Sequence, residues 1–165
     1  MKKQIKLYNV MFPVWMILMF PIALLVVLPV NFAIDSAVLL LTLRHLNTEG
    51  IKNNYLKSIF RIWLYGFLAD IIGTLFMLLG GVAEFGDFWY EHITTPIMKN
   101  PFRDWLGLAY TLLCIAISGV CIYFFNYKLA LRKTTLTDRE KRTVSIMLAV
   151  FTAPYLFLLP SAWIY

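Results

Sequence analysis

Long apolar stretches separated by short polar segments dominate the chain. Residues 7–34, 105–127 and 143–165 contain no Asp, Glu, Lys or Arg, and residues 62–83 are interrupted only by Asp70. A helix needs about 20 apolar residues to cross the hydrocarbon core of a bilayer. Because lipid offers the backbone no hydrogen-bonding partner, helices are the expected way to cross it. The pattern therefore predicts an all-α fold, a polytopic integral membrane helical bundle.

The first apolar stretch allows two architectures. Residues 8–45 are too many for one membrane span and few for two, and they contain three prolines, Pro13, Pro21 and Pro29. One kinked helix is compatible with this pattern. A tight hairpin that turns at residues 29–31 is equally compatible with it.

The distribution of basic residues favours the hairpin. Lys and Arg number three in the N-terminal tail, four in 44–61, two in 84–104 and six in 128–142. A hairpin places 3 + 4 + 6 = 13 of them on one side and 2 on the other, whereas a single span gives 4 + 6 = 10 against 3 + 2 = 5. Cytoplasmic loops are enriched in Lys and Arg. We therefore expect about five spans, with the N-terminus inside and the C-terminus outside. The expected spans of this single domain, residues 1–165, are 9–28, 30–45, 59–82, 105–127 and 143–164.

Composition supports a membrane protein. Apolar residues make up 61% of the chain and charged residues 15%, against about 45–50% and 25% in soluble domains. The net charge of +6 comes from basic loops, which face anionic lipid in membrane proteins. We expect a lipid bilayer as partner and no nucleic acid. Small multi-pass chains of this kind are typical of the bacterial cytoplasmic membrane.

Small residues recur on one face of the third predicted span. Gly66, Asp70, Gly73, Met77 and Gly80 are separated alternately by four and three residues. Glycines at this spacing allow a neighbouring helix to approach closely. The fourth span has a matching series at the same spacing, which begins at Gly107 and continues through Thr111, Cys114, Ser118 and Cys121. The two series predict that these spans pack against each other, with Gly66, Gly73, Gly80 and Gly107 as packing positions.

Asp70 is the central residue of a candidate intramembrane polar site. Spans three and four are antiparallel, and counting depth from their ends places Asp70 level with about residue 116. Cys114 and Ser118 then flank Asp70, and the Ser118 hydroxyl is in position to hydrogen bond to its carboxyl group. Two interpretations remain open. Asp70 holds the helices together as a polar group, or it binds a proton, cation or ligand group, because acids inside the membrane are costly and often functional.

Asp35 and Asn31 form a second polar pair on the short second span. Asp35 lies about 7 Å from the predicted outer end, and Asn31 lies one helical turn away. Under the five-span assignment Asp35 and Asp70 differ in depth by about 10 Å. We therefore do not expect them to form a catalytic pair of aspartates.

The fifth span contains prolines that interfere with a regular helix. Pro154 and Pro160 lack the backbone N–H that an α-helix requires. The segment 152–154 is therefore expected to open the helix near the middle of the membrane, a feature that also occurs at transport sites.

Motifs for catalysis and metal binding are not recognisable. The chain has no phosphate-binding loop, nucleophile elbow or zinc-protease motif, and Cys114 and Cys121 lack the spacing of a thiol redox or zinc motif. We expect no enzyme activity, metal or cofactor. The first functional hypothesis is a non-catalytic membrane subunit (scaffold, assembly, immunity or accessory factor) that packs with another membrane protein or with its own copies. The alternative is a solute- or ion-transport component that uses an intramembrane carboxylate.

Overall fold

The computed structural model describes residues 21–83 and 85–161, and for residues 21–24 it describes the backbone only. Every regular element in this part of the chain is a helix. The four long helices are α1 (Pro21–His45), α2 (Ile51–Val82), α5 (Trp105–Lys128) and α6 (Asp138–Phe151). The short elements are α3 (Asp87–Trp89), the π-helix η2 (Tyr90–Thr94), α4 (Thr95–Lys99), and the 3-10 helices η3 (Pro101–Arg103), η4 (Ala130–Lys133) and η5 (Tyr155–Leu158).

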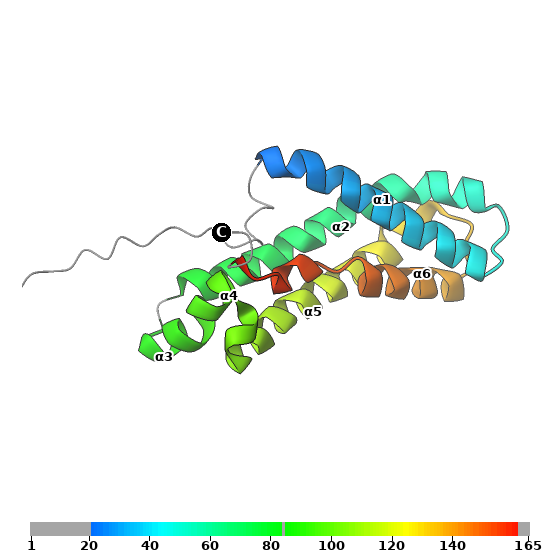
Figure 1. Ribbon diagram of the computed structural model, residues 1–165. Helices are drawn as coiled ribbons and strands as arrows, with labels where there is room; N and C mark the ends of the chain where they lie inside the picture. The colour runs from blue at the N-terminus through cyan, green and yellow to red at the C-terminus, as the bar shows by residue number, and fades with distance from the viewer. Residues whose placement is uncertain (1–20, 84, 162–165) are drawn as a thin grey trace, which may run out of the picture.

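The long helices form an all-α bundle, as predicted. Helix α2 packs on α5, α5 on α6, and α1 on both α2 and α6 (Figure 1). In the described residues four segments are long and apolar enough to cross a membrane: Leu25–His45, Ile51–Val82, Trp105–Lys133 and Asp138–Leu158. This architecture is that of a membrane protein.

The predicted turn at residues 29–31 is wrong. Helix α1 runs without interruption from Pro21 to His45, with Pro29 inside it. Proline removes the helical hydrogen bond to the carbonyl four residues before it, and it is tolerated within membrane helices. Next to Pro29, the indole nitrogen of Trp63 on α2 donates a hydrogen bond to the Leu28 carbonyl at 3.0 Å, which ties this part of α1 to α2. The enrichment of Lys and Arg in cytoplasmic loops indicates on which side of the membrane a loop lies. It does not indicate at which residue the chain turns. The predicted span 30–45 is therefore part of α1, and most of the predicted span 9–28 lies outside the described residues.

Two connecting loops meet at one end of the bundle, which we call the basic end because segments 44–61 and 128–142 carry ten Lys and Arg residues. The buried Asn54 side chain accepts hydrogen bonds from the backbone N–H and the hydroxyl of Thr135, at 2.9 and 3.0 Å. The Thr48 hydroxyl donates to Glu140 at 2.7 Å. These contacts join the α1–α2 connection to the start of α6 and to the loop before it, so both basic segments lie at the same end of the bundle.

The α2–α5 connection folds back against the opposite end of the bundle. The Trp89 indole and the Thr94 hydroxyl both donate to the carbonyl of Gly80, at 3.1 and 3.0 Å. Ile93 and Ile97 are buried against Met77. The α2–α5 connection is therefore a set of short helices that covers the ends of α2 and α5 (Figure 1).

The last span is interrupted, as predicted. Helix α6 begins five residues earlier than expected, because Thr137 and Glu140 form a capping box at its start. It ends at Phe151, and the chain passes through Thr152, Ala153 and Pro154 before η5 begins. Proline cannot donate the next helical hydrogen bond, and its ring collides with the preceding turn. The predicted span 143–164 thus consists of a helix, a break and the short helix η5. Residues 162–164 lie outside the described part.

Buried apolar side chains form two separate clusters. The cluster nearer the basic end includes Leu43, Ile62 and Leu148, and the other includes Met77 and Phe157. The candidate functional site lies along the bundle between them.

Candidate functional site

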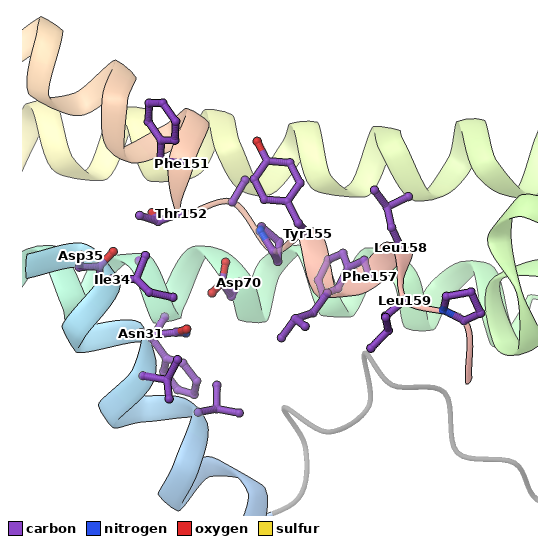
Figure 2. Close-up of a pocket in the computed structure, with 18 of the residues that line it drawn as sticks. Asn31, Ile34, Asp35, Asp70, Phe151, Thr152, Tyr155, Phe157, Leu158 and Leu159 are labelled. Atoms are coloured by element: carbon purple, nitrogen blue, oxygen red, sulfur yellow. The ribbon is translucent and has the colours of Figure 1, made fainter. Parts of the chain in front are cut away.

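A cavity of about 780 Å³ lies between α1, α2 and the segment that follows α6 (Figure 2). Helix α1 contacts α6, but its N-terminal part lies away from η5 (Figure 1). Residues 151–160, which include the break after α6, form one wall of this space. The lining is mainly apolar, and its two charged groups are Asp35 and Asp70.

Asp70 occupies the position that the helical spacing predicts. Its side chain is only 6% exposed, and its Oδ1 atom accepts a hydrogen bond from the Ser118 hydroxyl at 3.2 Å. The predicted contact between Asp70 and Ser118 is confirmed. A carboxylate offers about four acceptor positions on its two oxygens, so one hydroxyl leaves most of this capacity for another partner.

Asp35 lies much closer to Asp70 than the sequence indicates. A Cβ atom built on Gly66 is 3.6 Å from Oδ2 of Asp35, and Gly66 precedes Asp70 by one helical turn, about 6 Å. The expected 10 Å difference in depth is wrong, because it assumed that the chain turns just before Asp35. In the continuous α1 this residue lies well inside the helix. Asp35 is 5% exposed and has the Thr152 side chain beside it, while the Thr152 hydroxyl donates to the Leu148 carbonyl at 2.8 Å.

The four packing glycines contact three different neighbours. Gly73 faces α5, as predicted, since a Cβ atom there lies 3.0 Å from the Ser118 Cβ and 3.1 Å from the Phe157 ring. Gly80 also faces α5, against Tyr110. Gly66 instead faces Asp35 on α1, and Gly107 faces Pro96 on α4. The prediction that all four lie between α2 and α5 is therefore wrong for Gly66 and Gly107.

The other predicted site residues divide into two groups. Asn31 lines the cavity beside Asp35. Cys114 is buried in the apolar cluster with Met77 and is not part of the cavity lining. Sequence reasoning missed Thr152 as the partner of Asp35, although its position beside the proline break marks it as a candidate.

Phe157 was also missed by the sequence reasoning. It is 1% exposed, lines the cavity and packs against Gly73. Nothing in an apolar run distinguishes this phenylalanine from its neighbours before η5 is known to turn it inward (Figure 2).

Among the described residues that line the cavity, the two carboxyl groups have no cationic partner. None of the described lining residues is Lys, Arg or His. Within residues 21–83 and 85–161 the one ion pair joins His92 to Asp104, and neither residue lines the cavity. A buried acid is normally paired or hydrogen bonded because desolvating a charge is costly. In the described part of the chain, the other residues that line the cavity with these two acids are neutral.

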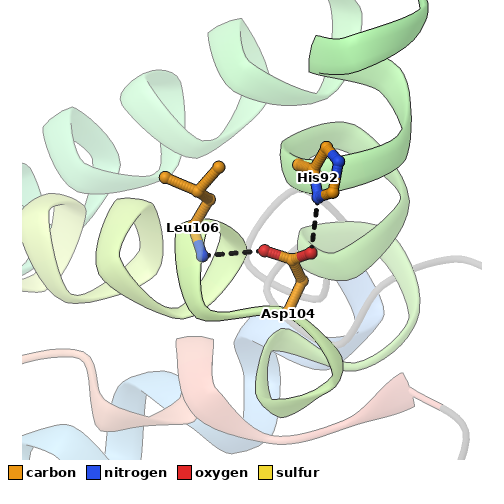
Figure 3. A network of polar contacts seen from close by, with 3 residues as sticks. All are labelled: His92, Asp104 and Leu106. Carbon is orange, nitrogen blue, oxygen red and sulfur yellow. Dashed lines mark hydrogen bonds and ion pairs between the residues drawn. The ribbon is translucent and has the colours of Figure 1, made fainter.

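His92 and Asp104 join the α2–α5 connection to the start of α5 (Figure 3). His92 Nδ1 lies 2.7 Å from Asp104 Oδ2, and the backbone N–H of Leu106 donates to Asp104 Oδ1 at 2.8 Å. Asp104 thus caps α5 and positions η2 at the same time. The hydrogen bond with His92, followed by the one from Leu106, holds the pKa of Asp104 below its ordinary value of 3.8.

The lowered pKa of Asp104 predicts a dependence of stability on pH. Its contribution is complete above the unfolded pKa of 3.8 and is lost as the pH falls through the lower folded value. We expect Asp104→Ala to lower the thermal unfolding temperature in detergent at about pH 5 and the difference from wild type to shrink toward about pH 2. Asp87→Ala, at an exposed acid of the same connection, serves as the control. A difference that stays constant to the lowest pH contradicts a role for the charged form of Asp104.

The chain matches no protein-family model, and no curated protein and no solved structure is detectably similar to it. Inference about function therefore depends on the geometry of the cavity.

Proposed function

We propose that this protein is a membrane component of solute or ion transport that binds a positively charged solute or ion between Asp35 and Asp70. The observation that carries the proposal is the placement of these two carboxyl groups, from two helices, on one cavity without a cationic partner among the described residues. Ionisable groups inside membranes are rare and commonly belong to substrate or ion pathways.

The interruption of α6 supports the same proposal. Thr152, at the break, contacts Asp35, and residues 152–154 line the cavity. Discontinuous helices are common at transport sites, because an unwound segment near the middle of the bilayer supplies polar groups to a ligand. A regular helix would keep those backbone groups bonded to one another.

The first hypothesis from the sequence, a non-catalytic accessory subunit, is compatible with this proposal in one respect. A chain of 165 residues is short for a transporter that alternates access alone, so we expect it to act with a second copy or with another membrane protein. We propose the cytoplasmic membrane of a bacterium as its location, with the basic end on the cytoplasmic side.

Cation-dependent stabilisation tests the proposal. A ligand that binds only the folded state stabilises it by about 2.7 kcal/mol at 100 times its Kd. We expect at least one chloride salt from a panel of Na⁺, K⁺, tetramethylammonium and larger quaternary ammonium ions to raise the unfolding temperature of the full chain in lipid nanodiscs. The double variant Asp35→Asn/Asp70→Asn should remain folded and lose this response.

The matched control is Asp87→Asn, which removes an exposed acid outside the cavity. It should retain the response to the cation, because only the cavity carboxylates contribute to binding. If no cation stabilises the wild type, or if the double variant responds as the wild type does, the proposed function is wrong.

A further inference from the structure

The cavity is much larger than a single inorganic ion requires. A water molecule in the liquid occupies about 30 Å³, whereas this cavity measures about 780 Å³. Sites for drug-sized molecules commonly measure about 300–1,000 Å³ and have mainly apolar walls with a few placed polar groups. Its volume and lining are thus typical of a site for an organic molecule.

The polar groups are concentrated in one part of the cavity. Along α1, the lining residues extend over about 12 Å from Val27 to Asp35. Asp35 is the lining residue of α1 that lies nearest the basic end. Thr152 is near the same end of the segment that follows α6, and it contacts Asp35. Gly66 lies beside Asp35 and has no side chain, so the space between α1 and α2 at this point is not filled by α2.

The remainder of the lining, toward the opposite end of the bundle, is apolar. It includes Val27 on α1, Phe102 on η3 and Leu158, Leu159 and Pro160 beyond α6. Figure 2 shows Leu158 and Leu159 displaced from Asp35, with Asp70 between them. A ligand that matches both regions has a positive group at one end and an apolar body at the other.

We propose that the ligand is an organic cation with an apolar body, a hydrophobic amine or quaternary ammonium compound, whose positive group lies between Asp35 and Asp70 and whose body extends toward Phe102 and Leu159. This inference rests on the proposed function and names the class of solute. The positive group supplies the charge that the carboxylates lack, and the body covers the apolar walls. A small inorganic cation meets the first requirement and leaves the second unmet.

The test compares ligands that share one apolar body. Full-length protein in nanodiscs is titrated calorimetrically with trimethyl(4-phenylbutyl)ammonium, with neutral 4-phenylbutan-1-ol and with anionic 4-phenylbutanoate, and titrations of empty nanodiscs are subtracted. Tetramethylammonium and Na⁺ serve as positive groups without the body. We expect the phenylbutyl cation to bind at least about tenfold more tightly than the alcohol, because the charge contributes, and at least about tenfold more tightly than tetramethylammonium, because the body contributes.

Variants locate the site. Asp35→Asn and Asp70→Asn should each weaken binding of the phenylbutyl cation by about tenfold or more while leaving the weak binding of the alcohol unchanged. Phe102→Ser should weaken binding of the phenylbutyl cation and leave binding of tetramethylammonium unchanged. Asp87→Asn should behave as the wild type.

Each contrary result has a distinct meaning. If Na⁺ or tetramethylammonium binds as tightly as the phenylbutyl cation, the apolar body contributes nothing and this inference is overturned, whereas the proposed function stands. Equal binding of the alcohol and the cation overturns it as well, because the cavity is then only apolar. Failure of every cation to bind overturns both proposals.

Discussion

Gly73→Leu is expected to destabilise the bundle by about 3 kcal/mol or more, the upper part of the range for overpacking a tight interface. A Cβ atom at this position lies 3.0 Å from the Ser118 Cβ, 3.1 Å from the Phe157 ring and 3.4 Å from the backbone carbonyl of Cys114. The carbonyl belongs to α5 and cannot rotate away as a side chain does. A leucine therefore has to move α5 and η5 away from α2.

Thermal unfolding in detergent, combined with recovery of the monodisperse protein on size-exclusion chromatography, measures this effect. Two variants of α2 serve as controls. Gly66→Ala should keep or raise stability, by up to about 1 kcal/mol, because alanine favours helix and its Cβ lies at an ordinary 3.6 Å from Asp35. Phe76→Leu, at a side chain 41% exposed to the surroundings, should be mild. If Gly73→Leu is as stable as these two, α2 and α5 do not pack closely at Gly73.

Asp70→Leu and Asp70→Asn are expected to separate the structural and functional roles of this acid. Leucine removes the acceptor of the fully buried Ser118 hydroxyl, and leaving a buried polar group without its partner costs about 1–3 kcal/mol. Asparagine keeps an acceptor oxygen of the same size, so Asp70→Asn should fold with nearly wild-type stability. It has no negative charge, however, and should bind the phenylbutyl cation about tenfold or more weakly.

Unfolding temperature and binding of the phenylbutyl cation, measured on the same preparations, distinguish these outcomes. Ser118→Ala should lose the hydrogen bond and retain cation binding, because alanine leaves the charge of Asp70 in the cavity. An Asp70→Asn protein that binds cations as the wild type does would show that Asp70 only holds α2 and α5 together. If Asp70→Leu is as stable as the wild type, Asp70 does not contribute to the stability of the bundle.

Local patterns were sufficient to predict the class of fold and one contact of the site. The length and polarity of the apolar stretches identify membrane helices because the bilayer has a fixed thickness. The Asp70–Ser118 contact follows from the regular rise of two adjacent antiparallel helices, which sets the depth of each residue. Pro154 marks the break in α6 because its ring and missing N–H act within one turn of its own helix.

The contacts of α1 depended on tertiary structure. Pro29 and the count of basic residues suggest a hairpin, but α1 continues through Pro29, and this places Asp35 beside Gly66. Whether a proline turns the chain or is accommodated in a helix depends on what packs against that helix, here α2, whose Trp63 donates a hydrogen bond to the Leu28 carbonyl. The residues that pack there are distant in sequence, so the local pattern is the same in both cases.

The sequence by itself thus determined that this chain is a bundle of membrane helices, that Asp70 lies beside Ser118, and that the last span is broken. Only the tertiary structure decided that Asp35 and Asp70 line the same cavity, that Gly107 packs on Pro96, and that Phe157 turns inward against Gly73. The first group follows from the geometry of single helices and the thickness of the bilayer. The second group depends on how α1, the α2–α5 connection and η5 pack against α2 and α5. Many contacts between residues far apart in the chain determine this packing.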